Sequence, residues 1–381
     1  MKRHAQLYLT ISVLAAVLAL MCSCQGATTS SAVAGGDTLA MRHATLLTLT
    51  AHDGYTTATL ADPWNEGQTL HTYILVPSDG GTLPDSIGAA TVVRTPVRRA
   101  VIATSVHCSL LMELGCGTSI AGVCDLKWIN LPWIQQRAKK DSIADCGNSM
   151  SPTVETIIAL QPDAIFLSPF QNSGGYGRVE QTGIPIIEMS DYMETGPLAR
   201  AEWMRFYGLL FGVPERADSL FATVEANYNE LKDRATAVPR GRSVMMDMMM
   251  GGVWYVPGGQ STIGRLIADA NAGYPWAGDE HSGSLQLAFE SVLEQGADAD
   301  VWLIRYSSPT PLSSRSMLAD NKGYGQFKAF KEGAVFGCDT RKSLFFEQTP
   351  FHPDRLLRDL IIITHPDITG MGEPEYFQKI D

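Results

Sequence analysis

The sequence contains no complete signature of a common catalytic site. A GxSxG nucleophile elbow, a phosphate-binding P-loop and an HExxH zinc motif are all absent. Gly115 and Gly117 begin a GxG pattern, but the third glycine of a dinucleotide-binding loop does not follow at the required offset. These absences argue against the enzyme classes that the motifs mark, so we expect no catalytic residue. An exported α/β enzyme stays open as the less favoured alternative.

Cysteine is scarce beyond the amino terminus. Apart from Cys22 and Cys24, five cysteines remain, an odd number that cannot all pair, and no CxxC or paired metal-binding spacing occurs. The five are Cys108, Cys116, Cys124, Cys146 and Cys338. We expect small buried thiols rather than a disulfide framework.

Basic residues are too few for a surface that binds nucleic acid. Without Lys2 and Arg3, which belong to the expected signal, 27 Lys and Arg residues face 40 Asp and Glu residues. The net charge is then −13 with His neutral. A surface of this sign repels the phosphate backbone, which argues against nucleic acid as a partner.

The histidines occur singly along the chain. Those beyond the signal are His43, His52, His71, His107, His281, His352 and His365. A transition-metal site would need His, Asp and Glu side chains from distant segments to converge. We therefore predict no metal site, and a receptor for bare zinc or manganese stays open as an alternative function.

The amino terminus has the composition of an export signal. A basic start precedes an apolar run from Leu7 to Met21, about 15 residues and short of the roughly 20 that a spanning helix needs. Ser23 places a small residue before Cys24, which resembles a bacterial lipoprotein signal whose cysteine is lipidated. Cys24 is the expected lipid anchor, with Cys22 as its alternative and a plain secretory signal as the other interpretation.

The mature chain is long enough for two domains, because 45% hydrophobic and 18% charged residues in 381 residues are typical of a globular protein. After a signal peptide over residues 1–24, the small and polar residues 25–40 predict a flexible tether. Residues 41–97 alternate apolar and polar side chains between turn-forming residues, which predicts an antiparallel β extension.

From residue 98 strands alternate with helices, a pattern typical of parallel sheets. We expect an α/β fold of two lobes, over residues 98–213 and 238–381, each a mainly parallel sheet flanked by helices. In the second lobe we expect a strand over residues 243–250, helices over 261–271 and 285–295, and a strand over 299–306.

The segment between the lobes predicts two helices. The second begins at Pro214, which suits a first helical position, and its apolar residues recur at spacings of three and four. These residues are Ala217, Leu220, Phe221, Val224, Tyr228, Leu231 and Ala235. We expect a linker helix over residues 214–237, about 34 Å long at 1.5 Å per residue, and an earlier helical segment, 197–211, packed on the first lobe.

Ligands of such sheets meet the loops that follow the carboxyl ends of the strands, and this rule selects the candidate ligand-binding residues. In the first lobe they are Ser105, His107, Trp128, Trp133, Phe170, Asn172, Tyr176 and Tyr192. In the second they are Trp254, Tyr255, Arg305, Tyr306 and Arg341. Broad aromatic faces with arginine suit a large, partly apolar, anionic ligand. The alternative for Trp128, Trp133 and Trp254 is that they simply cover the lobes.

The two lobes also repeat one local pattern. Glu155 begins ETIIALQPDAIFL and Glu290 begins ESVLEQGADADVWLI, each a glutamate in an amphipathic helix before a short turn and a buried strand. A carboxylate in the first turn of a helix also interacts favourably with the helix dipole, which is the simpler interpretation of both.

From about Val101 to Ile368 the chain resembles the class III periplasmic substrate-binding lipoproteins of ABC importers, which bind iron-siderophore, haem or cobalamin. The resemblance rests on SPTVETIIALQPDAIFLS, the pair GIPIIEM and PLARAEWMRFYGLLFG, WYVPGGQSTIGRLIADANAGY and EQTPFHPDRLLRDLIIITHP. It implies two lobes joined by one long helix, a ligand in the cleft between them and only small hinge motion.

The resemblance further implies a monomeric, lipid-anchored protein of the periplasm without a covalently bound cofactor. Its ligand would be a metal chelate, such as a ferric siderophore or haem, or a corrinoid such as cobalamin. Its protein partners would be a membrane permease and that permease's ATPase. Glu155 and Glu290 stand where the family carries docking glutamates for permease arginines. The β extension and the abundant Trp and Tyr depart from the shortest family members, so the ligand's identity does not carry over.

Overall fold

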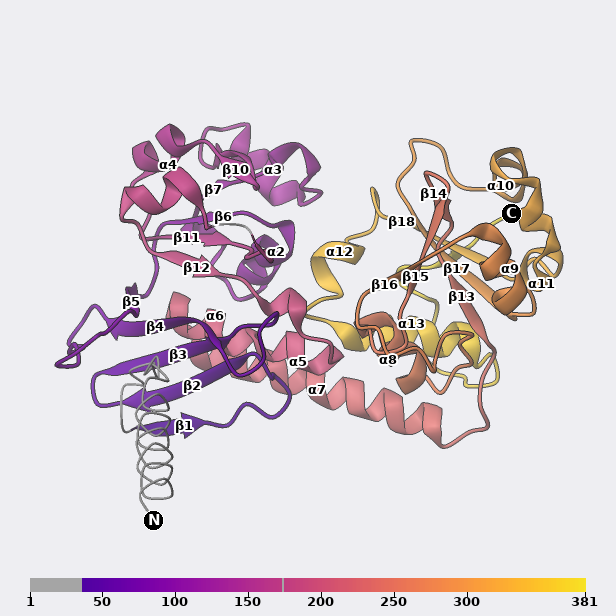
Figure 1. Cartoon of the computed structure of the whole chain (residues 1–381), viewed down its shortest axis with the longest axis horizontal. Coiled ribbons are helices and arrows are strands. Elements are labelled where there is room, and N and C mark those ends of the chain that lie inside the picture. Colours follow the sequence, from indigo (N-terminus) through magenta and orange to yellow (C-terminus); the bar gives the residue numbers. More distant parts are fainter. Residues whose placement is uncertain (1–35, 173–174) are drawn as a thin grey trace, which may run out of the picture. The chain divides into compact units, whose positions relative to one another are not determined.

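The computed structural model describes residues 36–172 and 175–381. The expected signal peptide, with Cys22 and Cys24, lies outside the described residues. Figure 1 shows the elements along the chain, from the amino-terminal strands through two α/β lobes to the carboxyl terminus. Within the described residues no helix is both long enough and apolar enough to cross a membrane.

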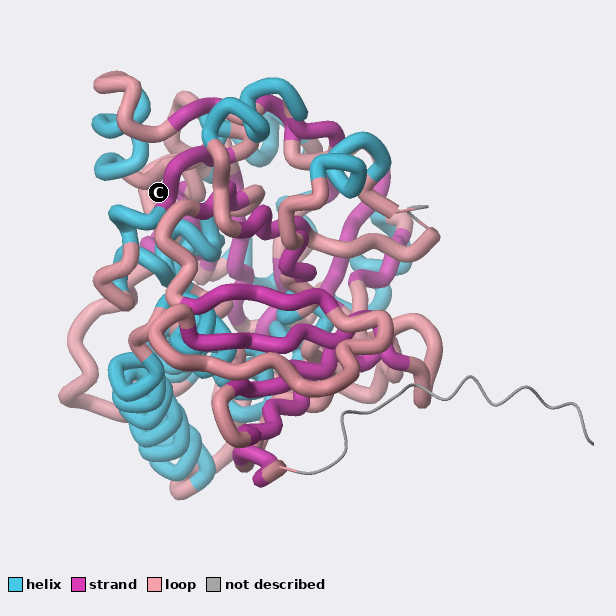
Figure 2. The backbone as a smooth tube through the Cα atoms, turned by 90° about the vertical axis from the view of Figure 1, so that its left-hand side faces the viewer, coloured by secondary structure: helices cyan, strands magenta, loops and turns pink. Residues whose placement is uncertain are grey.

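The amino-terminal extension is a five-stranded sheet in the order β1-β2-β3-β4-β5. Its strands are β1 (Asp37–Leu39), β2 (Leu47–His52), β3 (Tyr55–Ala61), β4 (Thr69–Pro77) and β5 (Thr91–Thr95). In Figure 2 strands of this sheet cross the foreground. The first three strand pairs are antiparallel as expected, but β5 runs parallel to β4 because residues 78–90 carry the chain back across the sheet. The expected tether ends earlier than residue 40, because β1 already pairs with β2.

Two buried glutamates, Glu194 and Glu202, hold the start of this extension on the rest of the protein. Glu202 accepts hydrogen bonds from the backbone N–H groups of Arg42, His43 and Ala44 at 2.8–2.9 Å. Glu194 accepts from the backbone N–H groups of the next two residues, 45 and 46, and from the indole N–H of a buried tryptophan. The extension is therefore an integral part of the folded unit.

A third carboxylate reaches the same segment from the linker helix. Glu225 pairs with the guanidinium of Arg42 at 2.6 Å and with the imidazole of His43 at 2.7 Å.

The first lobe is a parallel sheet in the order β12-β11-β6-β7-β8. Its strands are β6 (Ala100–Ile102), β7 (Ile120–Val123), β8 (Ala144–Asp145), β11 (Ala164–Leu167) and β12 (Ile186–Glu188). The helices are α2 (Ser105–Glu113), α3 (Pro132–Ala138) and α4 (Val154–Leu160). The segment SPTVETIIALQ predicts a helix over residues 151–161. The short pair β9 (Gly147–Asn148) and β10 (Ser151–Pro152) precedes α4, so this helix begins three residues later.

Helix α2 shows how local sequence sets its bounds. The Thr104 side chain caps its first turn by accepting from the His107 N–H. Gly115 follows its last turn with φ of +78°, a conformation that favours glycine. The sequence pattern predicts a helix from His107 to Leu114 that Gly115 closes; the helix ends before this glycine as expected but begins two residues earlier, at Ser105.

The second lobe has the sheet order β13-β17-β18-β19, in which only β19 is antiparallel. Its strands are β13 (Val244–Met246), β17 (Val301–Tyr306), β18 (Val335–Asp339) and β19 (Gln378–Lys379). A separate antiparallel sheet contains β14 (Met249–Met250), β15 (Val253–Pro257) and β16 (Ser284–Leu287). The helices are α8 (Thr262–Asp269), α9 (Phe289–Gly296), α10 (Ser314–Asp320), α11 (Lys328–Lys331), α12 (Phe345–Gln348) and α13 (Pro353–Thr364).

Two predictions in this lobe were wrong in detail. The helix expected over residues 285–295 begins only at Phe289, because residues 284–287 pair with β15 as strand β16. The strand expected over residues 243–250 is broken at Asp247, whose φ of +59° turns the chain between β13 and β14.

Between the sheets lie α5 (Pro197–Glu202), α6 (Met204–Phe211) and α7 (Pro214–Thr236), so the linker helix forms almost as predicted. Helix α6 contacts β5 and α7, whereas α5 contacts α8 and α13 of the second lobe as well.

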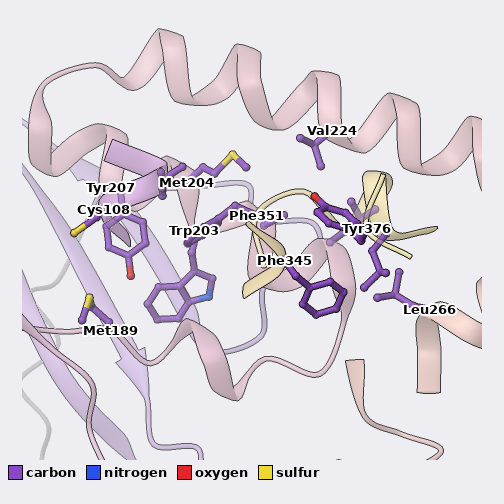
Figure 3. Close-up of a cluster of buried hydrophobic side chains, with 14 of the residues drawn as sticks. Cys108, Met189, Trp203, Met204, Tyr207, Val224, Leu266, Phe345, Phe351 and Tyr376 are labelled. Atoms are coloured by element: carbon purple, nitrogen blue, oxygen red, sulfur yellow. The ribbon is translucent and has the colours of Figure 1, made fainter. Parts of the chain in front are cut away.

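The lobes also share a buried core, part of which Figure 3 shows. Phe351 of the second lobe packs edge-on against the rings of Tyr207 and His107, with ring centroids 6.0 and 5.7 Å apart. The linker helix is therefore only part of the connection between the lobes.

The five remaining cysteines are free and buried, as the residue pattern predicted.

Candidate functional site

The loops that follow the parallel strands of the two lobes meet at their carboxyl ends. The side-chain amide of Asn130, after β7, donates to the backbone carbonyl of Thr340, after β18, at 2.9 Å. Ser105, the first residue of α2, forms a hydrogen bond with the side chain of Glu347 in α12. In Figure 1, α12 lies between the two sheets. We call these loops, residues 124–131, 168–172 and 340–348, the strand-end loops.

The strand-end loops expose large apolar side chains. Trp128 is 70% exposed, Phe170 is 42% exposed and Phe346 of α12 is 50% exposed. Exposed apolar residues gathered on functional loops are typical of a binding surface. Phe346 was missed in the sequence. The sequence feature that could have marked it as a candidate binding residue is the Phe-Phe pair after the polar turn that follows β18.

The first lobe has a cavity of about 710 Å³ beside these loops. Its walls come from residues 149–155, residues 167–171 and residues 175–179, and they include the predicted residues Phe170 and Tyr176. This volume is in the range of small-molecule sites, roughly 300–1,000 Å³. Asn172 lies in the adjoining turn with φ of +58° and an exposed side chain.

Two predicted residues, Tyr192 and Tyr306, are half-buried and take part in hydrogen bonds that connect loops. The Tyr192 hydroxyl donates to the Pro169 carbonyl at 2.6 Å, which joins the loops after β11 and β12. Tyr306 ends β17, and its carbonyl accepts from the backbone N–H of Thr340 at 2.9 Å.

His107 has an internal role, in contrast to the expected contact with a ligand. Its side chain is buried, and its Nε2 lies 2.9 Å from Asp191 Oδ1 and 2.8 Å from the Tyr207 hydroxyl. Its Nδ1 lies 2.6 Å from Thr104 Oγ1. Both ring nitrogens are therefore engaged inside the lobe.

The buried carboxylate in this network is held ionised. Burial alone would raise the pKa of Asp191, but the charges of His107 and Arg200 outweigh it and hold that pKa well below its usual range. Arg200 Nε lies 3.0 Å from Asp191 Oδ2.

Trp254 also differs from its predicted place, because it lies within β15 and is fully buried. Its indole N–H donates to the Met246 carbonyl at 2.9 Å, and its ring stacks on Trp302 at 5.6 Å. For this residue the alternative interpretation, a core side chain, is the one that fits. Tyr255 points to the opposite face of the strand and is exposed.

Trp133 is half-buried on α3, where the Arg137 guanidinium lies 4.8 Å from its ring centre and its edge approaches Gly117. It covers the lobe rather than extending into solvent.

The two predicted arginines differ in how much of their charge is available. Arg305 pairs through Nε with Asp247 at 3.0 Å and lies over the Phe345 ring. Burial would lower the pKa of Arg305, but the Asp247 carboxylate outweighs it and raises that pKa. Arg341 is exposed, and among the described residues its guanidinium has no hydrogen-bond or ion-pair partner. Arg341 is thus the free cation of the two.

Glu155 and Glu290 both lie in the first turns of their helices, α4 and α9, and both are exposed. Glu155 pairs with Arg178 at 2.8 Å. Its own backbone N–H, followed by Arg178, lowers the pKa of its carboxyl group. Stabilisation by the helix dipole accounts for either residue in the isolated protein.

Throughout residues 36–172 and 175–381, no three His, Cys, Asp or Glu side chains form a group able to hold a metal ion.

Comparison with known proteins places these features in a family. Residues 101–341 match the sequence profile of a family described as periplasmic binding protein. An uncharacterized lipoprotein of Methanocaldococcus jannaschii is 26% identical over 298 residues, which cover 76% of this chain and 70% of that protein. The molybdate-binding protein MolA of Haemophilus influenzae is 20% identical over 275 residues, covering 67% of this chain and 76% of that protein.

Two solved structures share the fold. A periplasmic haem-binding protein from Pseudomonas aeruginosa matches with a TM-score of 0.57 and 17% identity, over 75% of this chain and 98% of that one. The periplasmic vitamin B12-binding protein of Vibrio cholerae matches with a TM-score of 0.53 and 12% identity, over 70% of this chain and 96% of that one.

Proposed function

Because this chain belongs to the family of periplasmic binding proteins, we propose that it is the substrate-binding component of an ABC importer. It captures a metal chelate, such as a ferric siderophore or haem, or a corrinoid between its two lobes. It then delivers this ligand to a membrane permease driven by an ATPase, and it catalyses no reaction itself.

The observation that carries the proposal is the exposed apolar surface on the strand-end loops of both lobes. Trp128 and Phe170 supply it on the first lobe and Phe346 on the second. The hydrogen bond from Asn130 to Thr340 supports a common site, because it brings the two sets of loops together. Aromatic side chains of this size suit the flat, apolar surface of a chelate better than a small hydrated ion.

Arg341 is the residue that we assign to the acidic edge of the ligand. Its guanidinium is exposed and has no partner among the described residues, so a carboxylate or similar group can bind it without first breaking an ion pair. Arg305 is the poorer candidate because Asp247 already neutralises it.

Delivery of the ligand would depend on a lipid anchor and on two exposed glutamates. Lipid attachment at Cys24 would hold the protein at the outer face of the membrane that contains the permease. Glu155 and Glu290 lie exposed, one on each lobe, and would pair with arginines of the permease.

The relative named as molybdate-binding supports a second candidate ligand, a small oxyanion. Arg341 would also suit such an anion. A small oxyanion would leave Trp128 and Phe346 exposed, so we rank it below the chelate.

Titration of the purified mature protein tests the proposal. Ferric siderophores, haemin, cobalamin and molybdate would each be added while tryptophan fluorescence is followed, with free N-acetyltryptophanamide as the control for absorption by the ligand. We expect saturable binding of one molecule per chain for at least one chelate or corrinoid. Binding of molybdate alone would favour the second candidate, and no response to any of the four would refute the proposal.

Two variants separate the reporter from the binding contact. Trp128→Phe keeps an aromatic face and should retain affinity while it changes the fluorescence signal. Trp128→Ala should lose affinity by about ten-fold, the scale of one lost aromatic contact.

A further inference from the structure

A second pocket lies between the amino-terminal sheet and the first lobe. It has a volume of about 530 Å³. One wall is formed by β4, β5 and the preceding loop, and the other by β12 and the turn before it. We call it the sheet–lobe pocket. It exists only because the amino-terminal sheet is packed against the first lobe, and it contains none of the exposed aromatic residues of the strand-end loops.

A buried carboxylate forms the polar end of the sheet–lobe pocket. The Glu188 side chain is only 13% exposed. Its Oε1 accepts from the Tyr176 hydroxyl at 3.1 Å, whereas its Oε2 is enclosed and accepts no hydrogen bond from the described residues. The titratable group that faces Oε2 is His71, whose Nδ1 lies 3.7 Å away. The Glu188 charge therefore lacks a full counter-charge.

The surroundings of Glu188 add negative charge. Burial raises the pKa of Glu188, and the nearby carboxylates of Asp62 and Glu180 raise it further. Burial also lowers the pKa of His71, which favours the neutral imidazole. Among the residues that the structure describes, no lysine or arginine lines the pocket. A positively charged ligand would find an uncompensated carboxylate here, with little competition from a side-chain cation.

The remaining walls are mostly apolar, with Thr91 as their polar residue. Ile87 and Val92 line the pocket from the sheet, and Ile184 and Ile186 line it from the first lobe. An apolar body would pack against these side chains while a charged head faced the carboxylates. The volume also suits a small molecule rather than a single ion.

From this arrangement we propose that the sheet–lobe pocket is a second binding site, which takes a small organic amine with an apolar body. The ammonium group faces Glu188 and Glu180, and the hydrocarbon part contacts the four aliphatic side chains. The amino-terminal sheet then has a function of its own, because it supplies half of the site.

The probe pair phenethylamine and 2-phenylethanol tests this proposal. The two molecules share an aromatic body and differ in charge, so their comparison isolates the carboxylates. Isothermal titration of the mature protein at neutral pH should show saturable, one-to-one binding of the amine. Its affinity should exceed that of the alcohol by about ten-fold, the scale of one charge-assisted hydrogen bond.

Three variants assign the binding to this pocket. Glu188→Gln should remove the preference for the amine. Ile87→Trp, at a half-exposed rim position, should weaken both probes by filling the pocket without altering its charge. Glu230→Gln, an exposed carboxylate on α7, is the matched control and should change neither affinity. Thermal melting of each variant would verify that it is folded.

Two results would overturn the proposal: equal affinity for the amine and the alcohol, or amine binding that survives both Glu188→Gln and Ile87→Trp. Neither result bears on the binding of a chelate, which the titration of the strand-end loops tests separately.

Discussion

Tyr176 donates a hydrogen bond to Glu188 across 3.1 Å, and this bond joins the walls of two cavities. Tyr176 lines both the cavity beside the strand-end loops and the sheet–lobe pocket, whereas Glu188 lines only the second. Both residues belong to the first lobe, and the amino-terminal sheet reaches this pair through Tyr73 of β4, whose hydroxyl accepts a hydrogen bond from the Glu188 backbone N–H at 2.8 Å.

Glu188→Gln should stabilise the protein at alkaline pH and have less effect in acid. Burial raises the folded-state pKa of Glu188. The contribution of its protonated carboxyl group to the free energy of unfolding is therefore fully present below the unfolded-state pKa of about 4.3. That contribution is lost as the pH rises through the folded-state pKa. Urea unfolding at pH 4 and pH 8 measures the difference. A variant that is destabilised equally at both pH values would contradict the buried, under-compensated carboxylate.

Trp254 and Trp128 should respond oppositely to truncation. Trp254→Ala empties a fully buried site, so we expect a loss of about 3–5 kcal/mol in the free energy of unfolding. Trp128→Ala removes a mostly exposed ring and should change stability by less than about 0.5 kcal/mol, while it weakens ligand binding. Denaturant unfolding and ligand titration on both variants make the comparison, and a large loss of stability in Trp128→Ala would place that residue in the core.

Glu202→Ala should detach the start of the amino-terminal sheet. The substitution leaves the backbone N–H groups of Arg42, His43 and Ala44 without their acceptor, at a cost of about 1–3 kcal/mol for each group that stays buried. Hydrogen exchange should accelerate in β1 and β2 before other strands. Arg42→Ala is the control, because it removes only an exposed ion pair, which is worth about 1 kcal/mol or less. Unchanged exchange in Glu202→Ala would refute the role of this carboxylate.

Charge reversal at Glu155 and Glu290 together should abolish uptake of the ligand by cells while leaving its affinity for the purified protein unchanged. Both residues are exposed and lie outside the strand-end loops. Glu155 and Arg178 also line the cavity of the first lobe, so unchanged affinity is expected for a ligand held by the strand-end loops of both lobes rather than inside that cavity. Arg178→Ala is the matched control, since it removes the surface partner of Glu155 and keeps the glutamate. Loss of affinity in the double variant would instead assign these carboxylates to the ligand site.

Periodic patterns predicted the elements whose packing is local. Pro214 and the apolar spacing that follows it predicted α7 to within one residue of its end, because one face of that helix is buried along its length. The alternation of strands and helices predicted the parallel sheets for a similar reason.

The sequence pattern predicted two segments of the second lobe incorrectly. Residues 243–250 form one apolar run in the sequence, but Asp247 adopts a positive φ and pairs with Arg305, which divides the run. Residues 284–287 alternate half-buried and exposed side chains, a period of two that signals a strand, but the adjoining apolar residues resembled the start of a helix.

The roles of several residues near the candidate site depend on contacts with residues distant in the sequence, which the sequence pattern does not reveal. His107 follows a strand end as a ligand residue would, and only the approach of Asp191, 84 residues later, reveals its internal role. The acceptors of the amino-terminal segment, such as Glu202, were equally hidden because their partners are backbone groups about 160 residues away. By contrast, position alone predicted that Trp128 and Arg341 would be exposed in loops after strands, and their contact with a ligand stays a prediction.

The crystal structure of the protein with the tightest ligand from the titration tests the central claim most directly. We expect one ligand between the lobes, in contact with Trp128 or Phe170 on one side and with Phe346 or Arg341 on the other. A ligand that contacts only one lobe, or that occupies the sheet–lobe pocket instead, would contradict it.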